Sequence, residues 1–175
     1  MTFNGARILP MTALKWSMSH AVFFPEIDDE HKEIFAAVSK LQQAVSSNGQ
    51  LPEICDLTRR LIDCAAEHFA HEERLMRAAR YPSLRWHKQQ HDAARKRVRQ
   101  FMEGIEQGDA GAGHALVEYL TNWLPNHTSL PDRMLGAFLR NQERSLFRLT
   151  LRGGTKPADA CAWVDSRGEK FDPLG

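Results

Sequence analysis

Apolar residues recur at intervals of three and four along much of the chain, which is the spacing of amphipathic helices. The first such segment begins at Asp28, a residue type that caps helix N-termini, and ends at the Ser47-Asn48-Gly49 break. The second opens at Pro52, which suits a first helical turn, and ends near Tyr81-Pro82. We therefore expect two helices in the first half of the sequence.

Two more helical segments follow in the second half. Ser83 can cap the third, which keeps an almost strict heptad repeat up to Gly108. The fourth comes after the glycine-rich stretch 108–113 and carries apolar residues at helical spacing from Leu116 to Leu130. Because the connections are short, successive helices must run antiparallel. The sequence thus predicts an all-α fold, an up-down-up-down antiparallel four-helix bundle.

The bundle is expected over residues 28–142, after an N-terminal loop segment over 1–27 and before a C-terminal extension of unknown role over 143–175. Apolar residues alternate with polar ones before a glycine pair in the extension, and a short apolar run after it can form another strand. The pattern favours a small β-hairpin and a frayed tail equally. The positions concerned are Phe147, Leu149, Leu151, Gly153-Gly154 and Cys161-Ala162-Trp163-Val164.

Composition is that of a soluble globular protein. Of the 175 residues, 42% are hydrophobic and 26% are charged, and no apolar stretch approaches the length of about 20 residues that a membrane helix needs. The net charge of +1 argues against nucleic acid as a partner. The N-terminal segment lacks the pattern of an export signal, so we expect a cytoplasmic protein without membrane insertion.

Seven polar residues occupy or adjoin the apolar stripes, where a bundle normally places hydrophobic side chains. A lone histidine on such a stripe is more often a hydrogen-bonded core residue than a ligand. Burying two carboxylates and five imidazoles together, however, costs more than a core of this size supplies unless a cation lies among them. The residues are His31, His68, Glu72, His87, His91, His127 and Asp132.

The spacing of these residues suits metal ions. Two pairs are four residues apart, so each pair lies on one helix face: His68 with Glu72, and His87 with His91. Asp132 follows His127 by five residues, so it turns inward only where the backbone departs from α geometry. Pro131 supplies a reason for that departure.

The ligand types indicate a centre with two metal ions. Imidazole with carboxylate suits iron, zinc, copper or manganese, and seven ligands are too many for one tetrahedral ion. On an assumed octahedral geometry, five histidines, two bridging carboxylates and one bridging oxygen leave one place open to a small diatomic ligand. A ferritin-like site is excluded because no Glu has a His three residues later, and a zinc-protease site because Leu75 stands where the second histidine must be.

Across about residues 16–140 the chain resembles the hemerythrin family, and its bacteriohemerythrins in particular. All seven ligands of that family are present in order and at the family's spacing. The matching segments are IDDEHKEIF around His31, HFAHEERLM around His68 and Glu72, YPSLRWHKQQH around His87 and His91, and WLPNHTSLPD ending at Asp132.

The resemblance implies a role for each of these residues. One iron would be bound by His87, His91 and His127, and the other by His31 and His68. Glu72 and Asp132, with a hydroxide or oxide, would bridge the two ions. Dioxygen would bind reversibly at the second iron with no substrate turned over, so we do not expect an enzyme.

The resemblance also implies an apolar wall that excludes water from the dioxygen site and slows irreversible oxidation. Plain core packing explains the same residues equally well. They are Phe69, Met76, Trp123 and Leu130.

Three residues depart from the family's pattern. Phe23 stands where glycine is common, so the loop must take a different backbone course or carry a bulky side chain near the site. Pro125 removes a helical hydrogen bond two residues before His127, so the fourth helix is expected to kink there. Thr128 replaces an apolar residue. These departures bear on the affinity for dioxygen more than on the identity of the ligands.

The remaining histidines and the metal-free site give further expectations. His71 and His114 are expected at the surface or in hydrogen bonds, and His20 can approach the site from the N-terminal loop. Without metal, we expect the converging histidines to have lowered pKa values, because charging them together in a core is costly.

Three functions are compatible with such a centre. The leading one is an oxygen carrier, for storage or delivery. The second is an oxygen or redox sensor that acts through a protein partner, and a tail that binds a specific protein would favour it. The third is peroxide or nitric-oxide handling, or iron donation for repair, for which the sequence offers no general acid or reductase partner.

Overall fold

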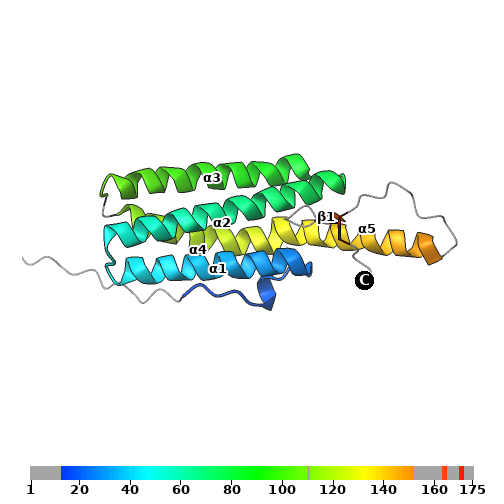
Figure 1. Cartoon of the computed structure of the whole chain (residues 1–175), viewed down its shortest axis with the longest axis horizontal. Coiled ribbons are helices and arrows are strands. Elements are labelled where there is room, and N and C mark those ends of the chain that lie inside the picture. The colour runs from blue at the N-terminus through cyan, green and yellow to red at the C-terminus, as the bar shows by residue number, and fades with distance from the viewer. Residues whose placement is uncertain (1–12, 110, 152–162, 165–169, 172–175) are drawn as a thin grey trace, which may run out of the picture.

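Four long helices lie side by side, with successive helices antiparallel (Figure 1). The structure is a computed structural model that describes residues 13–109, 111–151, 163–164 and 170–171, with the backbone alone from residue 146 onward. Each helix packs against two others, and the contacts between α1 and α4 close the bundle. The predicted up-down-up-down bundle is confirmed. Its helices are α1 (Pro25–Ser46), α2 (Leu51–Ala78), α3 (Leu84–Glu106) and α4 (Ala112–His127).

The first helix begins before Asp28, so the expectation that this residue caps it is wrong. Pro25 occupies the first turn of α1, where its missing N–H has no helical partner to lose. The Asp28 carboxylate instead accepts hydrogen bonds from the backbone N–H groups of Val22 and Phe23, at 2.8 and 3.0 Å. Asp28 therefore holds the loop that leads into α1, after the short 3₁₀ turn η1 (Met18–His20).

The fourth helix continues beyond the bundle in the same direction (Figure 1). Between α4 and the following helix α5 (Arg133–Leu151) lies a five-residue π turn, η2 (Thr128–Asp132). The predicted departure from α geometry before Asp132 is thus confirmed. The Thr128 hydroxyl donates to the carbonyls of Leu124 and Pro125, at 3.1 and 3.2 Å, which ties the start of the wide turn to α4.

The C-terminal extension differs from the expected strand pattern. Phe147, Leu149 and Leu151 lie in α5, so the strand expected there is wrong, and the helix runs through the expected bundle boundary at 142. Two residue pairs farther on do form an antiparallel ladder, β1 (Trp163–Val164) with β2 (Lys170–Phe171). The Gly153-Gly154 pair, Cys161 and Ala162 lie outside the described residues.

The core has two apolar clusters with a polar level between them. Their residues nearest to that level are Ile34, Leu61 and Leu124 in the larger cluster, and Ile27, Leu75 and Leu135 in the smaller. Along α1, α2 and α4–α5 the predicted ligands fall between these positions, so apolar packing closes the polar level at both ends. None of the helices described combines the length and hydropathy that a membrane crossing requires.

Candidate metal centre

Side chains from all four bundle helices and η2 meet at the polar level and form two overlapping groups of metal-ligand atoms. Within each group the ligand atoms lie within 4.8 Å of one another, and every residue is buried. One group consists of Glu72, His87, His91, His127 and Asp132, and the other of His31, His68, Glu72 and Asp132. The structure thus brings all seven predicted ligands together, and both groups share the two carboxylates.

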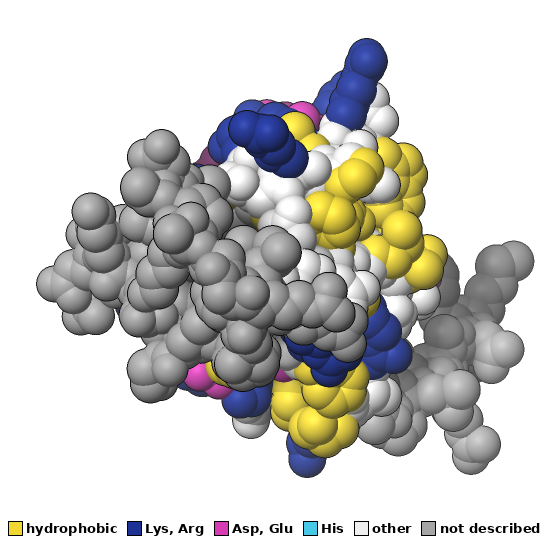
Figure 2. Space-filling view, turned by 90° about the vertical axis from the view of Figure 1, so that its right-hand side faces the viewer, with side chains coloured by type: hydrophobic (Ala, Val, Ile, Leu, Met, Phe, Trp, Pro, Cys, Tyr) yellow, Lys and Arg dark blue, Asp and Glu magenta, His cyan; other side chains and the backbone are white. Residues whose placement is uncertain are grey.

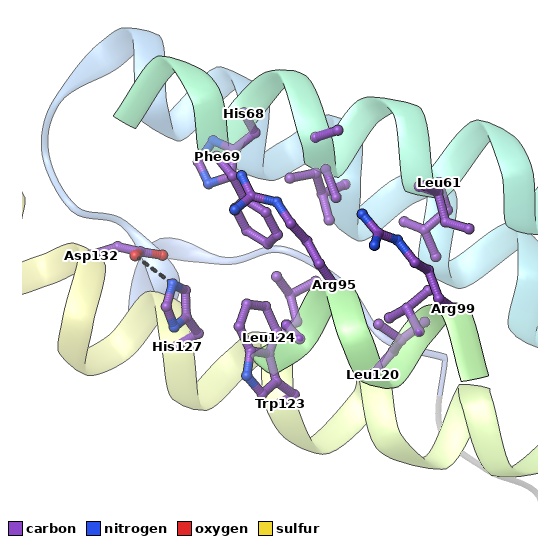
Figure 3. A pocket seen from close by; sticks show the side chains of 16 residues that line it. Leu61, His68, Phe69, Arg95, Arg99, Leu120, Trp123, Leu124, His127 and Asp132 are labelled. Carbon is purple, nitrogen blue, oxygen red and sulfur yellow. Dashed lines mark ion pairs between the residues drawn. The ribbon is translucent and has the colours of Figure 1, made fainter. Parts of the chain in front are cut away.

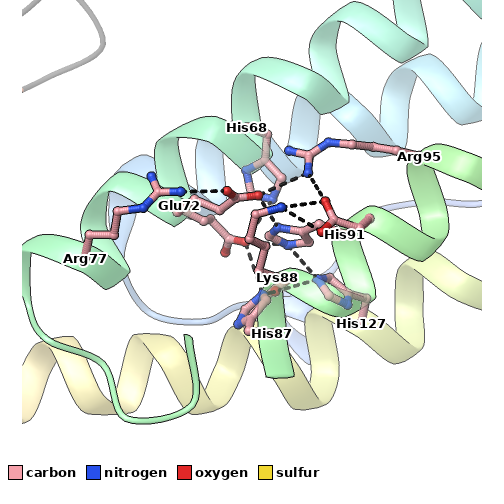
Figure 4. A network of polar contacts seen from close by, with 11 residues as sticks. His68, Glu72, Arg77, His87, Lys88, His91, Arg95 and His127 are labelled. Atoms are coloured by element: carbon pink, nitrogen blue, oxygen red, sulfur yellow. Dashed lines mark hydrogen bonds and ion pairs between the residues drawn. The ribbon is translucent and has the colours of Figure 1, made fainter. Parts of the chain in front are cut away.

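The Glu72 carboxylate lies among histidines of α2 and α3 (Figure 4). Glu72 Oε2 lies 3.2 Å from His91 Nε2 and 3.4 Å from His87 Nε2. The two oxygens of Asp132 divide between the groups, because Oδ1 lies 3.1 Å from His127 Nε2 while Oδ2 lies 3.2 Å from His31 Nε2. A carboxylate placed in this way can bridge two ions.

The position of Asp132 depends on the π turn. Hydrogen bonds that span five residues bring side chains five apart toward one face, as His127 and Asp132 require. The same wide turn leaves Leu130 57% exposed. The expectation that Leu130 lines an apolar wall is therefore wrong, because the backbone that turns Asp132 inward turns Leu130 outward.

Several buried polar atoms of this cluster have no hydrogen-bond partner among the described residues. They are both oxygens of Glu72, both oxygens of Asp132, and both ring nitrogens of His31 and of His87. A buried polar atom without a hydrogen bond costs several kcal/mol, so a set of this size indicates a site that pairs with cations. Nitrogen and oxygen donors without thiolate fit iron, zinc, copper or manganese.

Electrostatics keep both carboxylates ionised. Burial alone raises the pKa of Asp132, but His127, His31 and His87 hold it well below the usual range. Burial and Asp132 likewise raise the pKa of Glu72, and the surrounding histidines outweigh them and lower it. Two ionised carboxylates are therefore available to cations at neutral pH.

The histidines of the metal-free site do not all behave as expected. Burial disfavours the charged ring of His87, but Asp132 and Glu72 raise its pKa to about 9. The pKa of His31 is also raised against burial, mainly by Asp132, whereas burial lowers that of His91. The expectation of lowered pKa values is thus wrong for His31 and His87, because it left out the attraction of the two carboxylates.

Two carboxylates outside the ligand groups lie beside the outer nitrogens of ligand histidines. His68 Nδ1 and His71 Nδ1 both donate to Glu30, at 2.8 and 2.6 Å. Glu73 lies 3.5 Å from His91 Nδ1 and accepts a hydrogen bond from Arg95 at 3.1 Å. Such partners fix the orientation of a ligating imidazole. Sequence reasoning missed both acids because each contacts a histidine of another helix, although it did place His71 in hydrogen bonds.

Two of the other wall residues, Phe69 and Trp123, contact ligand histidines from the apolar side. The Phe69 ring stacks on His91 with centroids 4.1 Å apart, and the Trp123 ring stacks on His127 at 4.3 Å. Met76 is fully buried in the smaller apolar cluster.

An apolar cavity of about 130 Å³ extends from this wall along α2, α3 and α4 (Figure 3). Its inner end reaches His68, His127 and Asp132, and the side chains of Arg95 and Arg99 border it. The rest of its lining is almost wholly apolar, with Phe69, Trp123, Leu120 and Leu124 among the residues. The cavity thus connects the ligand cluster to a dry space of small-molecule size.

Phe23 shows how the chain accommodates its departure from glycine. Its φ is +60°, in the left-handed region that favours glycine, and its side chain is 52% exposed. The loop keeps a glycine-like backbone and turns the ring outward under the guanidinium of Arg140.

His20 lies against Phe35, with ring centroids 4.7 Å apart, and belongs to neither ligand group.

Comparisons with known proteins agree with this geometry. Residues 22–139 match the family model described as "Hemerythrin HHE cation binding domain". Myohemerythrin-1 of Phascolopsis gouldii is 32% identical over 67% of this chain and 87% of its own length, and Bacteriohemerythrin of Pseudomonas aeruginosa is 28% identical over 82% and 93%. A solved structure of a leucine-to-phenylalanine mutant is 26% identical, with a TM-score of 0.66 over 74% of this chain and 98% of that one. The chain belongs to the hemerythrin HHE cation-binding domain family.

Proposed function

We propose that this protein binds dioxygen reversibly at a di-iron centre and serves as an oxygen carrier, for storage or delivery. In this proposal His87, His91 and His127 hold one iron, His31 and His68 hold the other, and Glu72 and Asp132 bridge them. The two groups of ligand atoms support this division, because one contains three histidines, the other contains two different histidines, and both contain the two carboxylates. The names of the relatives, myohemerythrin and bacteriohemerythrin, support the same chemistry.

The apolar cavity is the observation that carries the proposal. It reaches His68 of the group with fewer histidines, as well as His127 of the other group and the shared Asp132. In this proposal the group with fewer histidines has a place left for a further ligand. A small cavity with apolar walls stays dry and accepts small apolar molecules, whereas a charged substrate would lose its hydration there. Iron supplies, when bound, the redox chemistry that reversible dioxygen binding needs.

The residues of this chain position and protect that centre. Glu30 orients the ring of His68 through a hydrogen bond to its Nδ1, and Glu73 lies 3.5 Å from His91 Nδ1, within ion-pair distance. Phe69 and Trp123 cover His91 and His127 and keep water from the cavity end of the cluster.

The cavity lining favours a binding protein over an enzyme. His68, His127 and Asp132 are proposed ligands, and the other ionisable residues of the lining are arginines. An arginine stays protonated and is a poor general base, so this lining offers no group for proton transfer to a substrate.

The test is iron loading under inert gas followed by metal analysis and visible spectra. We expect about two irons per chain, with a charge-transfer band that appears in air and disappears when dioxygen is removed. His31→Gln should abolish the reversible band, and His114→Gln, which changes an exposed histidine of α4, should leave it unchanged. Stoichiometric zinc in place of iron, or a colourless iron-loaded protein in air, would exclude an oxygen carrier.

A further inference from the structure

The corner between α2 and α3 is strongly basic in a protein that is nearly neutral. Residues 74–90 contain five Lys and Arg and no Asp or Glu, whereas the whole chain has 23 basic and 22 acidic residues. Arg77 pairs with Glu73 and Lys88 with Asp92. The other three are exposed and form no ion pair among the described residues: Arg74, Arg80 and Arg85. Their charge is therefore available to a partner.

The backbone at this corner holds an arginine where the fold favours glycine. Arg80 has a φ of +52° and follows the C-terminus of α2, where its N–H donates to Arg77 O at 3.1 Å and the Tyr81 N–H donates to Met76 O at 2.9 Å. Helices that end with this pattern usually carry glycine at the left-handed residue. An arginine there costs free energy, and such costs are typical of functional positions.

An exposed tryptophan lies in the middle of this basic corner and next to a proposed iron ligand. Trp86 is 40% exposed, and its ring centroid lies 6.5 Å from that of His87, which is fully buried in the ligand cluster. Electron transfer slows steeply with distance, so an exposed aromatic ring beside a ligand offers a short route from the surface to the centre. Tryptophan and arginine are also the residues that most often dominate protein interfaces.

This corner belongs to the end of the bundle shown in Figure 2. In the visible part of that face, Lys and Arg side chains lie next to hydrophobic ones. Exposed apolar side chains next to basic ones are typical of a protein interface that selects its partner by charge.

We infer that the surface of Arg80, Arg85 and Trp86 docks an acidic protein that carries single electrons, such as a ferredoxin, and that this partner re-reduces the centre after it has been oxidised. The inference rests on the proposed di-iron function. Two reduced carriers dock in turn and each gives up one electron, which together return a diferric pair to the diferrous state. No covalent bond forms or breaks between the proteins.

Charge alone would also attract nucleic acid, but two observations favour a protein carrier. The net charge of the chain is only +1, which gives little long-range attraction to a polyanion. The exposed aromatic ring lies beside a proposed iron ligand. Contact there shortens the electron-transfer distance for a redox partner, whereas a nucleic acid has no such use for the position.

The test uses the iron-loaded, oxidised protein and reduced plant-type ferredoxin. Stopped-flow spectroscopy measures the rate of reduction, and calorimetry measures the dissociation constant of the two proteins. At about 20 mM salt, the Arg80→Glu/Arg85→Glu double variant should lower the second-order rate constant by about tenfold or more, with the difference shrinking at high salt. Trp86→Leu should slow reduction even at saturating ferredoxin, since it removes the aromatic ring beside the ligand, and it should weaken binding less than the double variant because it keeps the charges.

The control is Lys40→Glu/Lys96→Glu, which makes the same change in charge at exposed residues of α1 and α3 away from this corner. The inference is wrong if the Arg80/Arg85 variant is reduced at the wild-type rate, or if the control slows reduction equally. Tighter binding of a short DNA duplex than of ferredoxin, lost in the same variant, would assign the surface to nucleic acid instead. A reversible dioxygen band without charge-dependent ferredoxin binding would refute the docking surface alone. Charge-dependent ferredoxin binding without a reversible dioxygen band would refute the dioxygen function alone.

Discussion

Glu72 and Asp132 differ from the histidines of the cluster because only they belong to both groups of ligand atoms. Replacing Glu72 with Gln keeps its shape and removes a negative charge from between two cations, which then repel each other in a buried site. We expect Glu72→Gln to retain fewer than about one iron per chain after loading and desalting, and His68→Gln to retain more. Equal iron in Glu72→Gln and in the control Glu67→Gln, an exposed residue of α2, would contradict a bridging role.

Phe23 carries backbone strain that a pair of variants can isolate. Phe23→Gly and Phe23→Ala both delete the exposed ring and its contact with Arg140, but only Ala keeps a Cβ at a φ of +60°. Because that Cβ is strained in the left-handed region, the Gly variant should have the larger free energy of unfolding, by about 1 kcal/mol. Urea unfolding monitored by circular dichroism measures the difference. An Ala variant at least as stable as the Gly variant would show that the loop relaxes.

The π turn is the element that makes the cluster complete. Deleting Ser129, an exposed residue of η2, leaves His127 and Asp132 four residues apart and removes the extra residue of the wide turn. The carboxylate then moves along the axis by about 1.5 Å, the rise of one residue, which exceeds the tolerance of about 0.5 Å for a ligand set. We expect the deletion variant to fold with unchanged helix content but to lose iron. The control Ser129→Ala keeps the turn and should bind iron like the wild type.

Local periodicity was enough to predict the four helices of the bundle, because the spacing of apolar residues records which face of each helix is buried. It was not enough to predict where the elements end. Asp28 resembles a helix cap but hydrogen-bonds to the preceding loop, and Phe147, Leu149 and Leu151 alternate like a strand although they lie in α5. The role of Asp28 depends on a contact with another segment, and the helix at Phe147 depends on the continuation of α5. A short sequence pattern contains neither kind of information.

The ligand cluster could be predicted for the same reason as the helices, since its seven polar residues interrupt apolar stripes. The outer carboxylates could not, because Glu30 lies on the polar face of α1 and meets His68 only after α1 and α2 pack together. Leu130 was placed wrongly because helical spacing was assumed across a turn that is wider than an α turn. Sequence patterns therefore predicted the seven ligand residues but not the carboxylates that contact them or the orientation of Leu130.

At the scale of the whole molecule, the polar level between the two apolar clusters gives the bundle two different states. In the metal-free protein, the charged ring of His87 balances the ionised Asp132 and Glu72. In the metal-bound protein each ligand imidazole must be neutral, and the cations take over that balance. The two states should therefore respond to pH in different ways.

The difference in melting temperature between the metal-bound and metal-free protein should widen as pH rises from about 6 to about 9. Asp132 and Glu72 raise the pKa of His87 to about 9 against the effect of burial, above its value of about 6.5 in an unfolded chain. A raised folded-state pKa gives stabilisation that is complete below about pH 6.5 and lost as pH rises through 9, on the order of 3 kcal/mol for this shift. The lowered pKa values of the two carboxylates matter only in acid, so they add no slope in this range.

Scanning calorimetry of both forms at several pH values tests this expectation. The metal-free protein should lose stability across the range, while the metal-bound protein should not, because protons compete with metal less as pH rises. Metal-free His87→Gln should have a flatter pH dependence than metal-free wild type, since it cannot gain or lose the proton concerned. Metal-free His114→Gln should keep the wild-type slope, because that exposed histidine lies outside the cluster. A constant difference in melting temperature from pH 6 to 9 would mean that no proton shared by His87 and the carboxylates is displaced when metal binds.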